Sequence, residues 1–424
     1  MSFEIIRDPL WNNIRVDELA LALIDTPAMQ RLRWVRQLGL AFLVYPGATH
    51  SRFEHALGTY HLARRALALL EERGDLGDWG RQECDIVRAA ALLHDVGHYP
   101  FSHALEEIGA LHHEEVARPL VLRGAIADVL TERLGAEAPE RIMALVRGES
   151  RSPLQRLISG SLDLDKLDYL RRDAAMCGVS YGDVDVDRLL NSLALVADPA
   201  TGEPTVGIAE KGLSALESLL FAKYQMYRNV YWHHAVRSAT AMYKRLVDDA
   251  IGVGALDAAT LAAFTDEGLL LDLARRAPSP LLSALRERRL YKRAFEAPAG
   301  ELSPNGGEWI ADERELVVRV ENQLARECGL APGELLLDYP AKTQMLGLDL
   351  PVVRRYGEIE RLTAEGWAGA IHLPKLSDEL YRSARWLRVF TAPRLALDPK
   401  RIVRLAEMTA AEVRSALGAG EALL

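Results

Sequence analysis

The sequence contains little cysteine: three of its 424 residues, Cys84, Cys177 and Cys328. These cysteines lie far apart, and no two have the CxxC spacing that is typical of thiolate metal sites. The sequence therefore indicates neither a disulfide framework nor a zinc site built from cysteine.

Long apolar runs are also missing. No stretch approaches the roughly 18 apolar residues that a helix needs to span a bilayer. The first residues, MSFEIIRDPLWNNI, carry acidic and polar side chains where a secretory signal has basic and then continuous apolar ones. We therefore expect no membrane partner and a cytoplasmic location.

The chain has no excess of positive charge, since its 51 Lys and Arg residues face 60 Asp and Glu residues, for a net charge of −9. A protein that mainly coats nucleic acid needs a net basic face to neutralise phosphates, so nucleic acid is not expected as the main partner. A local basic pocket for a small polyanion is compatible with this balance. Internal repeats and sustained heptads are absent, which argues against a solenoid or a coiled coil.

The sequence does have a strong helical periodicity. From Asp17 to about Ala250, apolar residues recur every three or four positions, as in AALLHDVGH, which is the spacing of helices with one buried face. The segment LVADPATGEPTVGIAE predicts a β-hairpin, because short apolar runs flank a turn-rich centre. Clusters of Gly, Pro, Asp and Ser predict breaks near residues 45–47, 74–80, 147–153 and 198–204.

The pattern changes after about residue 290. The runs ELLLDYP and WLRVFTAP indicate strands, and they alternate with the helical patterns WIADERELVVRVENQLAREC and DPKRIVRLAEMTAAEVRSAL. The predicted fold is therefore mainly α, with a helical domain over residues 1–290 and a smaller C-terminal α+β lobe over residues 291–424.

Histidine is concentrated in one region, because eight of the 11 histidines lie between His50 and His113. Histidine is the commonest neutral metal ligand and the usual acid or base near neutral pH. In AALLHDVGHYPFSH, His94 and Asp95 follow an apolar stretch and are expected near the end of a buried helix. Adjacent helical residues point about 100° apart, so an ion bound by both needs further ligands from other helices.

Two other segments offer such ligands. His55, in HSRFEHALGTYH, offers an imidazole, and SLDLDKLDYLRRD offers a carboxylate from Asp163, Asp165 or Asp168. Two histidines with two aspartates suit iron, manganese, zinc, nickel or cobalt and leave positions open for water and substrate. A lone His-Asp pair is more often structural. However, an aspartate among apolar helical residues is costly unless it is paired or coordinates a metal.

The segments HSRFEHALGTYHLA, HDVGHYPFSH, LHHEE and SLDLDKLDYLRRD, in this order, resemble the HD superfamily of metal-dependent phosphohydrolases. They are most similar to the dNTP triphosphohydrolases of the sterile-alpha-motif and HD-domain type and to their bacterial relatives. The resemblance runs from about Ile14 to His234 and weakens through the C-terminal lobe. It implies an HD-domain helical core, and we expect a bacterial relative that lacks the sterile-alpha-motif domain.

The resemblance implies a set of metal ligands and a separate catalytic cluster. In that cluster, a histidine oriented by an acidic residue positions the attacking water or protonates the leaving oxygen. The family has an aspartate where this chain has Glu106. The family's last metal ligand immediately precedes a lysine, which favours Asp165 because Lys166 follows it. The implied metal ligands are His55, His94, Asp95 and Asp165, and the implied catalytic cluster is His98, His103, Glu106 and His113. The implied cofactor is one transition metal ion (Fe, Mn, Zn, Ni or Co) together with Mg²⁺.

A triphosphate and sugar pocket follows from the same resemblance. Arg52, Lys166 and Lys223 match positions that contact the triphosphate, although relatives carry arginine at Lys223 and lysine lacks its bidentate fork. Taken without the family, Arg52 and Lys223 are equally well interpreted as solvated surface charges. Gln37 matches a residue that contacts the 3′-hydroxyl, and Leu38 matches one that crowds the 2′ position. The remaining sugar-side and base-side positions are Tyr169, Asp173, Tyr231 and His233.

The predicted activity is hydrolysis of dNTPs to deoxynucleoside and tripolyphosphate by a metal-activated water. Asp25, Gln30 and Arg33 match positions that read an activating guanine nucleotide at an oligomer interface, so an activating nucleotide and a homo-oligomer are expected. Two alternatives remain open. One is an HD phosphohydrolase that acts on nucleoside monophosphates or on cyclic or signalling nucleotides. The other is a catalytically inactive nucleotide sensor or a nucleic-acid-binding protein.

Overall fold

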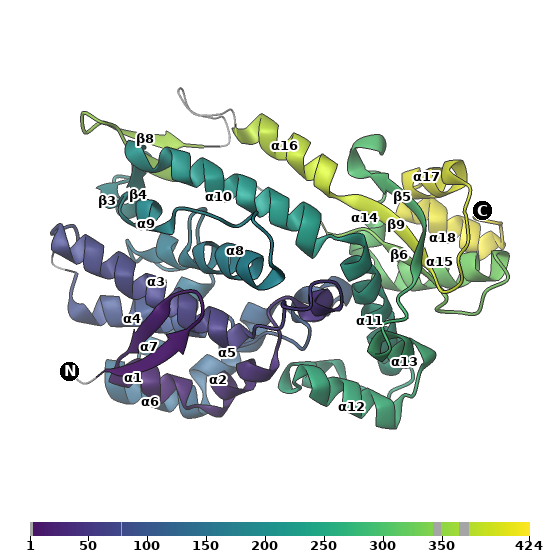
Figure 1. The fold of residues 1–424 in the computed structure, drawn as a ribbon, viewed down its shortest axis with the longest axis horizontal. Helices are drawn as coiled ribbons and strands as arrows, with labels where there is room; N and C mark the ends of the chain where they lie inside the picture. The colour runs from purple at the N-terminus through teal and green to yellow at the C-terminus, as the bar shows by residue number, and fades with distance from the viewer. Residues whose placement is uncertain (1–2, 78, 342–348, 364–372) are drawn as a thin grey trace.

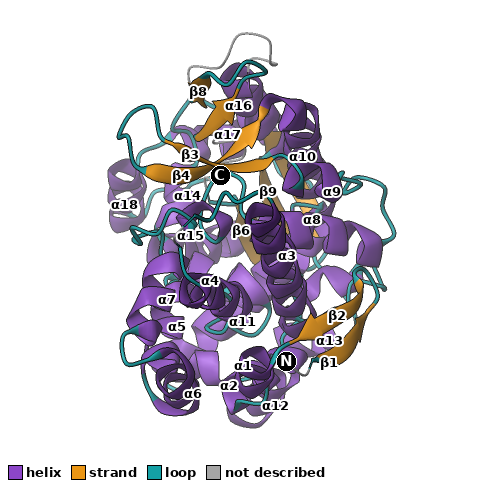
Figure 2. Ribbon diagram, turned by 90° about the vertical axis from the view of Figure 1, so that its left-hand side faces the viewer, coloured by secondary structure: helices purple, strands orange, loops and turns teal. Residues whose placement is uncertain are grey.

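The computed structural model describes residues 3–77, 79–341, 349–363 and 373–424. Helices dominate these residues, and their strands form three separate sheets (Figure 2). In Figure 1, helices from the first half of the chain fill one side of the molecule, and β9 (Trp386–Thr391) with the two helices that follow it lies at the opposite end. The predicted mainly α fold with a smaller α+β part is confirmed.

The chain begins with an antiparallel hairpin of β1 (Glu4–Asp8) and β2 (Asn12–Val16). The Asp8 carboxylate closes its turn by accepting hydrogen bonds from the backbone amides of Leu10 and Trp11. Ile14 and Val16 anchor the hairpin because their side chains are buried in the helical core. The sequence analysis does not predict these two strands, which precede the helical pattern that begins at Asp17.

The predicted breaks fall between the helices that follow the hairpin, so these breaks are confirmed. The 45–47 break precedes α3 (Arg52–Glu72), the 74–80 break separates α3 from α4 (Arg81–Leu93), and the 147–153 break lies between α7 (Ala138–Val146) and α8 (Leu164–Cys177). The helices of this part are α1 (Glu18–Ile24), α2 (Pro27–Arg31), α3 (Arg52–Glu72), α4 (Arg81–Leu93), α5 (His113–Leu122), α6 (Gly124–Leu134), α7 (Ala138–Val146), α8 (Leu164–Cys177), α9 (Val186–Leu190), α10 (Leu213–Met226), α11 (His234–Gly252), α12 (Asp266–Arg276) and α13 (Pro280–Arg286).

Three of these helices hold the chemistry-bearing segments together. Helix α3 packs against both α4 and α8. It begins with a capping box, in which the Ser51 hydroxyl accepts from the Glu54 amide and the Glu54 carboxylate accepts from the Ser51 amide. Helix α4 ends at Leu93, so His94 and Asp95 follow directly after its buried face. Residues far apart in sequence therefore meet where the three helices touch.

The predicted hairpin at the 198–204 break is confirmed as β3 (Leu193–Ala197) and β4 (Pro204–Ala209). Two later strands, β7 (Leu350–Val353) and β8 (Ile359–Leu362), extend it to a four-stranded sheet in which β4 and β7 run parallel. Leu350 and Val352 are buried in the same core as the N-terminal helices. The chain beyond residue 290 thus contributes to both parts of the molecule, and the division at that residue stays a prediction.

The α+β lobe has its own sheet and core. Its strands β5 (Lys292–Pro298), β9 (Trp386–Thr391) and β6 (Leu335–Asp338) lie in this order and are antiparallel. Val317 and Leu324, on one helix face, pack under the sheet against Leu337 and Val389. The helices of this part are α14 (Glu308–Asp312), α15 (Arg314–Glu327), α16 (Leu373–Ala384), α17 (Pro399–Glu407) and α18 (Ala410–Ala419).

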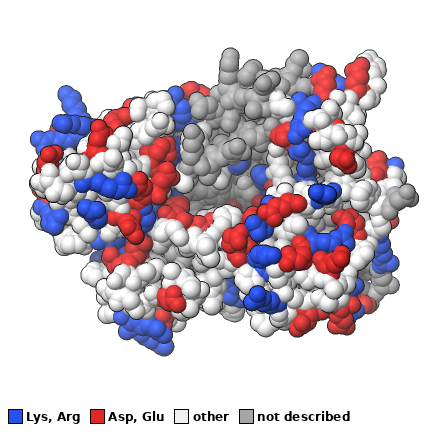
Figure 3. Space-filling model, turned by 180° about the vertical axis from the view of Figure 1, so that it is seen from behind, with Lys and Arg blue, Asp and Glu red and all other residues white. Residues whose placement is uncertain are grey.

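Acidic and basic side chains lie mixed on the face shown in Figure 3, so charge of one sign does not dominate that face. Among the described residues, no helix combines the length and the apolarity needed to cross a bilayer.

Candidate active site

The four predicted metal ligands converge on one point. His55 Nε2 lies 2.9 Å from Asp165 Oδ1, 3.2 Å from His94 Nε2 and 3.6 Å from Asp95 Oδ2. His94 Nε2 lies 3.5 Å from Asp95 Oδ1 and 3.6 Å from Asp165 Oδ1. Two imidazole nitrogens and two carboxylates from α3, the end of α4 and α8 thus face one another.

Both histidines are oriented for binding a metal through Nε2. The Nδ1 atom of His55 is 2.8 Å from Asp168 Oδ2, and the Nδ1 atom of His94 is 2.9 Å from the carbonyl oxygen of Ala91. When Nδ1 donates a proton to such an acceptor, Nε2 keeps its lone pair. The donor set of two imidazoles and two carboxylates fits a divalent transition metal.

The three neighbouring carboxylates on α8 have different partners, which separates their roles. Asp163 caps the helix and forms an ion pair with Lys166. Asp168 lies behind His55, where it also binds Arg172 at 2.8 Å and accepts from the Trp11 indole at 2.5 Å. Asp165 is the carboxylate that faces the two Nε2 atoms.

A glycine makes room for the Asp168 carboxylate that orients His55. A Cβ atom at Gly58 would lie 1.9 Å from Asp168 Oδ1, so any larger residue there would push the carboxylate away from His55. Arg172 is fully buried and also pairs with Asp8 of the N-terminal hairpin at 2.8 Å. The hairpin therefore stabilises the residues that orient the candidate metal ligands.

We predict that Asp168→Asn weakens metal binding about 10- to 100-fold, because the amide is a poorer acceptor for the His55 Nδ1 proton. Chelator competition against Zn²⁺ would measure the change in dissociation constant, with circular dichroism as a check on folding. Unchanged affinity in a folded variant would mean that Asp168 serves only to neutralise Arg172.

The predicted catalytic residues form a second cluster. The Glu106 carboxylate lies 2.8 Å from His113 Nδ1 through one oxygen and 2.8 Å from His103 Nδ1 through the other. The His98 ring stacks on the His113 ring with a centroid separation of 3.9 Å. Glu106 thus orients two imidazoles, so it can fill the role that the family gives to aspartate.

The electrostatics of this cluster suit proton transfer. Burial and the nearby Arg52 hold the pKa of His98 well below its ordinary value, and burial also lowers the pKa of His113. Burial acts to raise the pKa of Glu106, but its hydrogen bonds to His103 and His113 outweigh burial and lower the pKa. An ionised Glu106 carboxylate therefore faces His113, whose lowered pKa favours the neutral imidazole at neutral pH.

The two clusters are joined through Asp95. His98 Nε2 lies 3.1 Å from Asp95 Oδ1, and the Arg52 guanidinium lies 2.5 Å from Asp95 Oδ2. Arg52 is buried and also donates to the Ser102 hydroxyl, so it is not a solvated surface charge. Phe101 and Ser102 have positive φ angles of 58° and 63°, a local strain that is common at functional sites.

A buried ion cluster fastens the catalytic segment to the rest of the molecule. Arg237 of α11 donates to Glu107 at 2.8 and 2.9 Å and to Asp338 of β6 at 2.6 and 2.9 Å. Lys244 lies 2.8 Å from Glu107. Because Glu107 follows Glu106, this cluster holds the backbone that carries the two oriented histidines.

The residues predicted for the sugar side are partly linked to one another. Asp173 accepts from the Tyr231 hydroxyl at 2.7 Å and lies 2.8 Å from His50 Nε2. His50 was not singled out from the sequence, although it begins the motif HSRFEH. Gln37 is buried, and its Oε1 atom has no hydrogen-bond partner among the described residues.

The predicted cations occupy different surroundings. Lys166 donates to the Gly160 carbonyl at 2.9 Å and pairs with Asp163. Burial and the Lys166 ammonium lower the pKa of Lys223 to about 8. Tyr169 lies near the first cluster, since its ring centroid is 6.4 Å from that of His55.

Other predicted residues lie outside these two clusters. His233 caps α11, where its Nδ1 accepts from the Ala235 amide at 3.3 Å. Leu38 packs against the core just before a short helical turn, Gly39–Leu43. Gln30 and Arg33 bond to each other at 2.9 Å, and Arg33 stacks on Phe53. Asp25 ends α1 as its C-cap.

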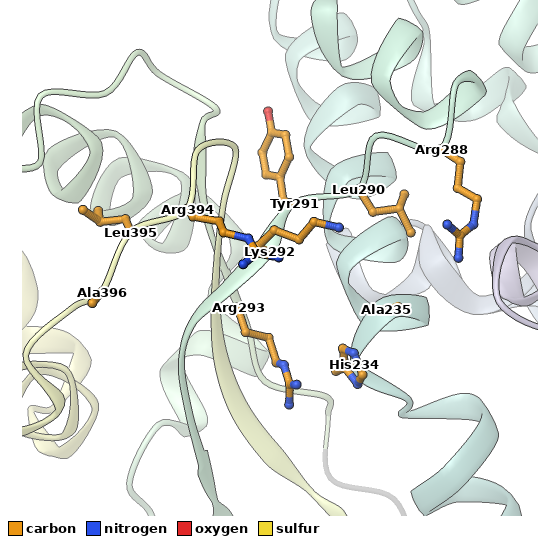
Figure 4. Close-up of a pocket in the computed structure, with 10 residues that line it drawn as sticks. All are labelled: His234, Ala235, Arg288, Leu290, Tyr291, Lys292, Arg293, Arg394, Leu395 and Ala396. Atoms are coloured by element: carbon orange, nitrogen blue, oxygen red, sulfur yellow. The ribbon is translucent and has the colours of Figure 1, made fainter.

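A separate basic cavity of about 530 Å³ lies between α11 and the α+β lobe (Figure 4). Lys292, Arg394 and His234 are among the residues that line this cavity. No residue predicted from the sequence lines this cavity. Its basic side chains come from two segments, 288–293 and 394–396, that form no local motif.

Comparisons with known proteins identify the family of the chain. A model of the HD domain matches residues 52–173, and a model of the HD associated region matches residues 184–365. An uncharacterized protein of Methanocaldococcus jannaschii is 35% identical over 330 residues, which cover 77% of this chain and 67% of that protein. The chain therefore belongs to the HD phosphohydrolase family.

Two further likenesses extend the comparison. The deoxynucleoside triphosphate triphosphohydrolase SAMHD1 homolog of Dictyostelium discoideum is 31% identical over 255 residues, covering 57% of this chain and 48% of that protein. The crystal structure of a phosphohydrolase from Bacteroides thetaiotaomicron matches with a TM-score of 0.72 and 22% identity, over 92% of this chain and 100% of that chain. The second likeness concerns the fold alone. The chain spans about half of the length of the Dictyostelium relative.

Proposed function

We propose that the protein is a dNTP triphosphohydrolase that releases deoxynucleoside and tripolyphosphate. One observation carries the proposal: each of four side chains has a nitrogen or oxygen atom within 3.6 Å of such an atom on another of them. The four are His55, His94, Asp95 and Asp165. The name of the Dictyostelium relative, a deoxynucleoside triphosphate triphosphohydrolase, supports the choice of substrate.

The residues of the chain have complementary roles in this reaction. A divalent ion at the four ligands would lower the pKa of water and neutralise charge on the phosphate. Lys166 and Lys223 would add positive charge near the polyanion. Arg52, which pairs with the candidate metal ligand Asp95, would add a third positive charge. His113 or His103, each oriented by Glu106, would exchange a proton with the attacking water or the leaving oxygen.

Sugar selection is part of the proposal. The buried Gln37 amide, with its unpaired oxygen, suits a contact with the sugar 3′-hydroxyl. Leu38 would crowd a 2′-hydroxyl, and Tyr169 with the Asp173–Tyr231 pair would border the sugar. His233 would lie on the base side, and Mg²⁺ would neutralise charge on the phosphates.

The decisive experiment is to incubate the purified protein with dATP or dGTP and Mn²⁺ and to identify the products. Release of tripolyphosphate supports the proposal, whereas monophosphate and pyrophosphate would contradict the cleavage position. Nucleoside monophosphates and cyclic nucleotides belong in the same panel, since turnover of these compounds alone would favour a different HD phosphohydrolase.

Regulation by a nucleotide remains a further proposal for the Asp25, Gln30 and Arg33 region. The same assay with and without added GTP tests for activation. Size-exclusion chromatography in both conditions tests whether the protein forms the expected homo-oligomer.

The charge on Lys223 should make the proposed activity depend on pH. Its pKa is lowered to about 8, and lysine is charged below its pKa, so the positive charge is lost as pH rises through that value. We expect kcat/KM for dATP to fall up to about tenfold for each pH unit above the pKa. Lys223→Arg should flatten this limb because a guanidinium stays charged. Identical pH profiles of kcat/KM for the two proteins would contradict the role of Lys223.

A further inference from the structure

We propose that His98, His103, Glu106 and His113 bind a second divalent transition metal ion, distinct from the ion at His55, His94, Asp95 and Asp165. The inference goes beyond the proposed function, because it concerns metal binding by the protein without any substrate. The two groups of ligands share no residue.

The geometry of the second cluster carries the proposal. Each of the four side chains offers one donor atom, and these atoms all lie within 4.8 Å of one another. Glu106 holds His103 and His113 in place through its two oxygens, at 2.8 Å each. The rings of His98 and His103 are 4.7 Å apart, and those of His98 and His113 are 3.9 Å apart.

A buried imidazole nitrogen without a hydrogen-bond partner points independently to a ligand. His98 is 1% exposed, and its Nδ1 atom has no hydrogen-bond partner among the described residues. A buried polar atom without a partner costs free energy, so such atoms are uncommon unless something binds them. A metal ion within the cluster would accept the lone pair of an imidazole nitrogen.

Modest side-chain movement completes the site. In a tetrahedral zinc site with bonds of about 2.0–2.1 Å, ligand atoms lie about 3.4 Å apart. The Glu106 contacts with His103 and His113 must therefore open from 2.8 Å, while the wider pairs, at up to 4.8 Å, must close in. The His103 side chain is 57% exposed, so it can rotate without disturbing the core and leaves a path for an ion from solvent.

The donor types select the class of metal. Three imidazoles and one carboxylate suit Zn²⁺ and similar transition metals, whereas Mg²⁺ prefers oxygen ligands in an octahedron. Zn²⁺ is therefore the appropriate probe.

Occupation of this cluster has a consequence for the proposed reaction. An imidazole nitrogen bound to an ion cannot accept or donate a proton, so the second ion would block the proton transfer assigned to His103 and His113. The protein should then be active with one ion per chain and inhibited by an excess of Zn²⁺.

The test is a titration of the metal-free, full-length protein with Zn²⁺, followed by measurement of bound zinc. The expected result is two equivalents for the wild type and one equivalent for His103→Ala. His113→Ala should also bind one equivalent, and His55→Ala should keep the ion of the second cluster. One equivalent in the wild type would overturn the proposal.

His112→Ala is the matched control, because His112 is 55% exposed and lies next to His113 in an alternative group with Glu114. This variant should keep two equivalents. Loss of an ion in His112→Ala but not in His103→Ala would assign the second ion elsewhere and overturn the proposal. All of these readouts measure metal content, so they remain decisive even if the protein does not hydrolyse dNTPs.

Discussion

Replacing Asp165 with alanine is expected to remove the first metal ion and to reduce hydrolysis of dATP by about a thousandfold or more. Asp165 Oδ1 faces His55 Nε2 at 2.9 Å and His94 Nε2 at 3.6 Å, and the variant would leave only three ligands. Metal-assisted stabilisation of the reacting phosphate is worth several kcal/mol, which corresponds to a loss of about this size. The metal content and the kcat of the purified variant measure both effects.

The folded structure should tolerate this change, because the Asp165 side chain is 33% exposed. Asp187→Ala provides a control, since Asp187 is a 71% exposed carboxylate that pairs with Arg65 on the surface. Exposed pairs of this kind contribute little to stability, so the control should keep its metal and its activity. Full metal content and full activity in Asp165→Ala would refute the ligand assignment.

Replacing Arg237 with methionine is expected to lower the free energy of unfolding by about 3–5 kcal/mol, because it removes the main partner of a buried carboxylate. Asp338 is 1% exposed and would keep Lys244, which lies 3.7 Å away, and the electrostatic interaction with Arg388 on the neighbouring strand. The same change removes one of the two cations that hold Glu107, the residue next to Glu106, and leaves Lys244. Chemical denaturation measures the loss of stability, and kcat at a temperature where the variant is folded measures any effect on the histidines.

The double variant Arg237→Met with Asp338→Leu separates charge imbalance from packing. It leaves Glu107 paired with Lys244 and removes the unpaired buried carboxylate, so it should recover part of the lost stability. If the double variant is less stable than Arg237→Met, burial of an unpaired Asp338 is not the cause of the loss.

Local patterns in the sequence predicted the helices, their breaks and the β3–β4 hairpin, because each depends on residues close together in the chain. The N-terminal hairpin was not predicted, because β1 is mostly exposed and lacks an alternating apolar face. Its contribution, the pairing of Asp8 with Arg172, joins residues 164 positions apart.

In the candidate site, too, local motifs indicate the ligands but not the remote residues that hold them in place. Motifs singled out the segments around His55, His94 and Asp165, since each segment carries its ligands on a few adjacent residues. The partners that hold these segments are remote: His50 meets Asp173 across 123 positions, and Arg237 meets Asp338 across 101. No periodicity or motif encodes such pairings, which depend on how whole helices pack.

The parallel pairing of β4 with β7 has a consequence for how the chain can be divided. A fragment ending at residue 290 would lose Leu350 and Val352 from the core and would leave one edge of β4 without its neighbour. Unpaired strand edges invite association between molecules. The N-terminal helices, although they carry every candidate ligand, would therefore form a poor expression fragment that self-associates, and biochemical work calls for the intact chain.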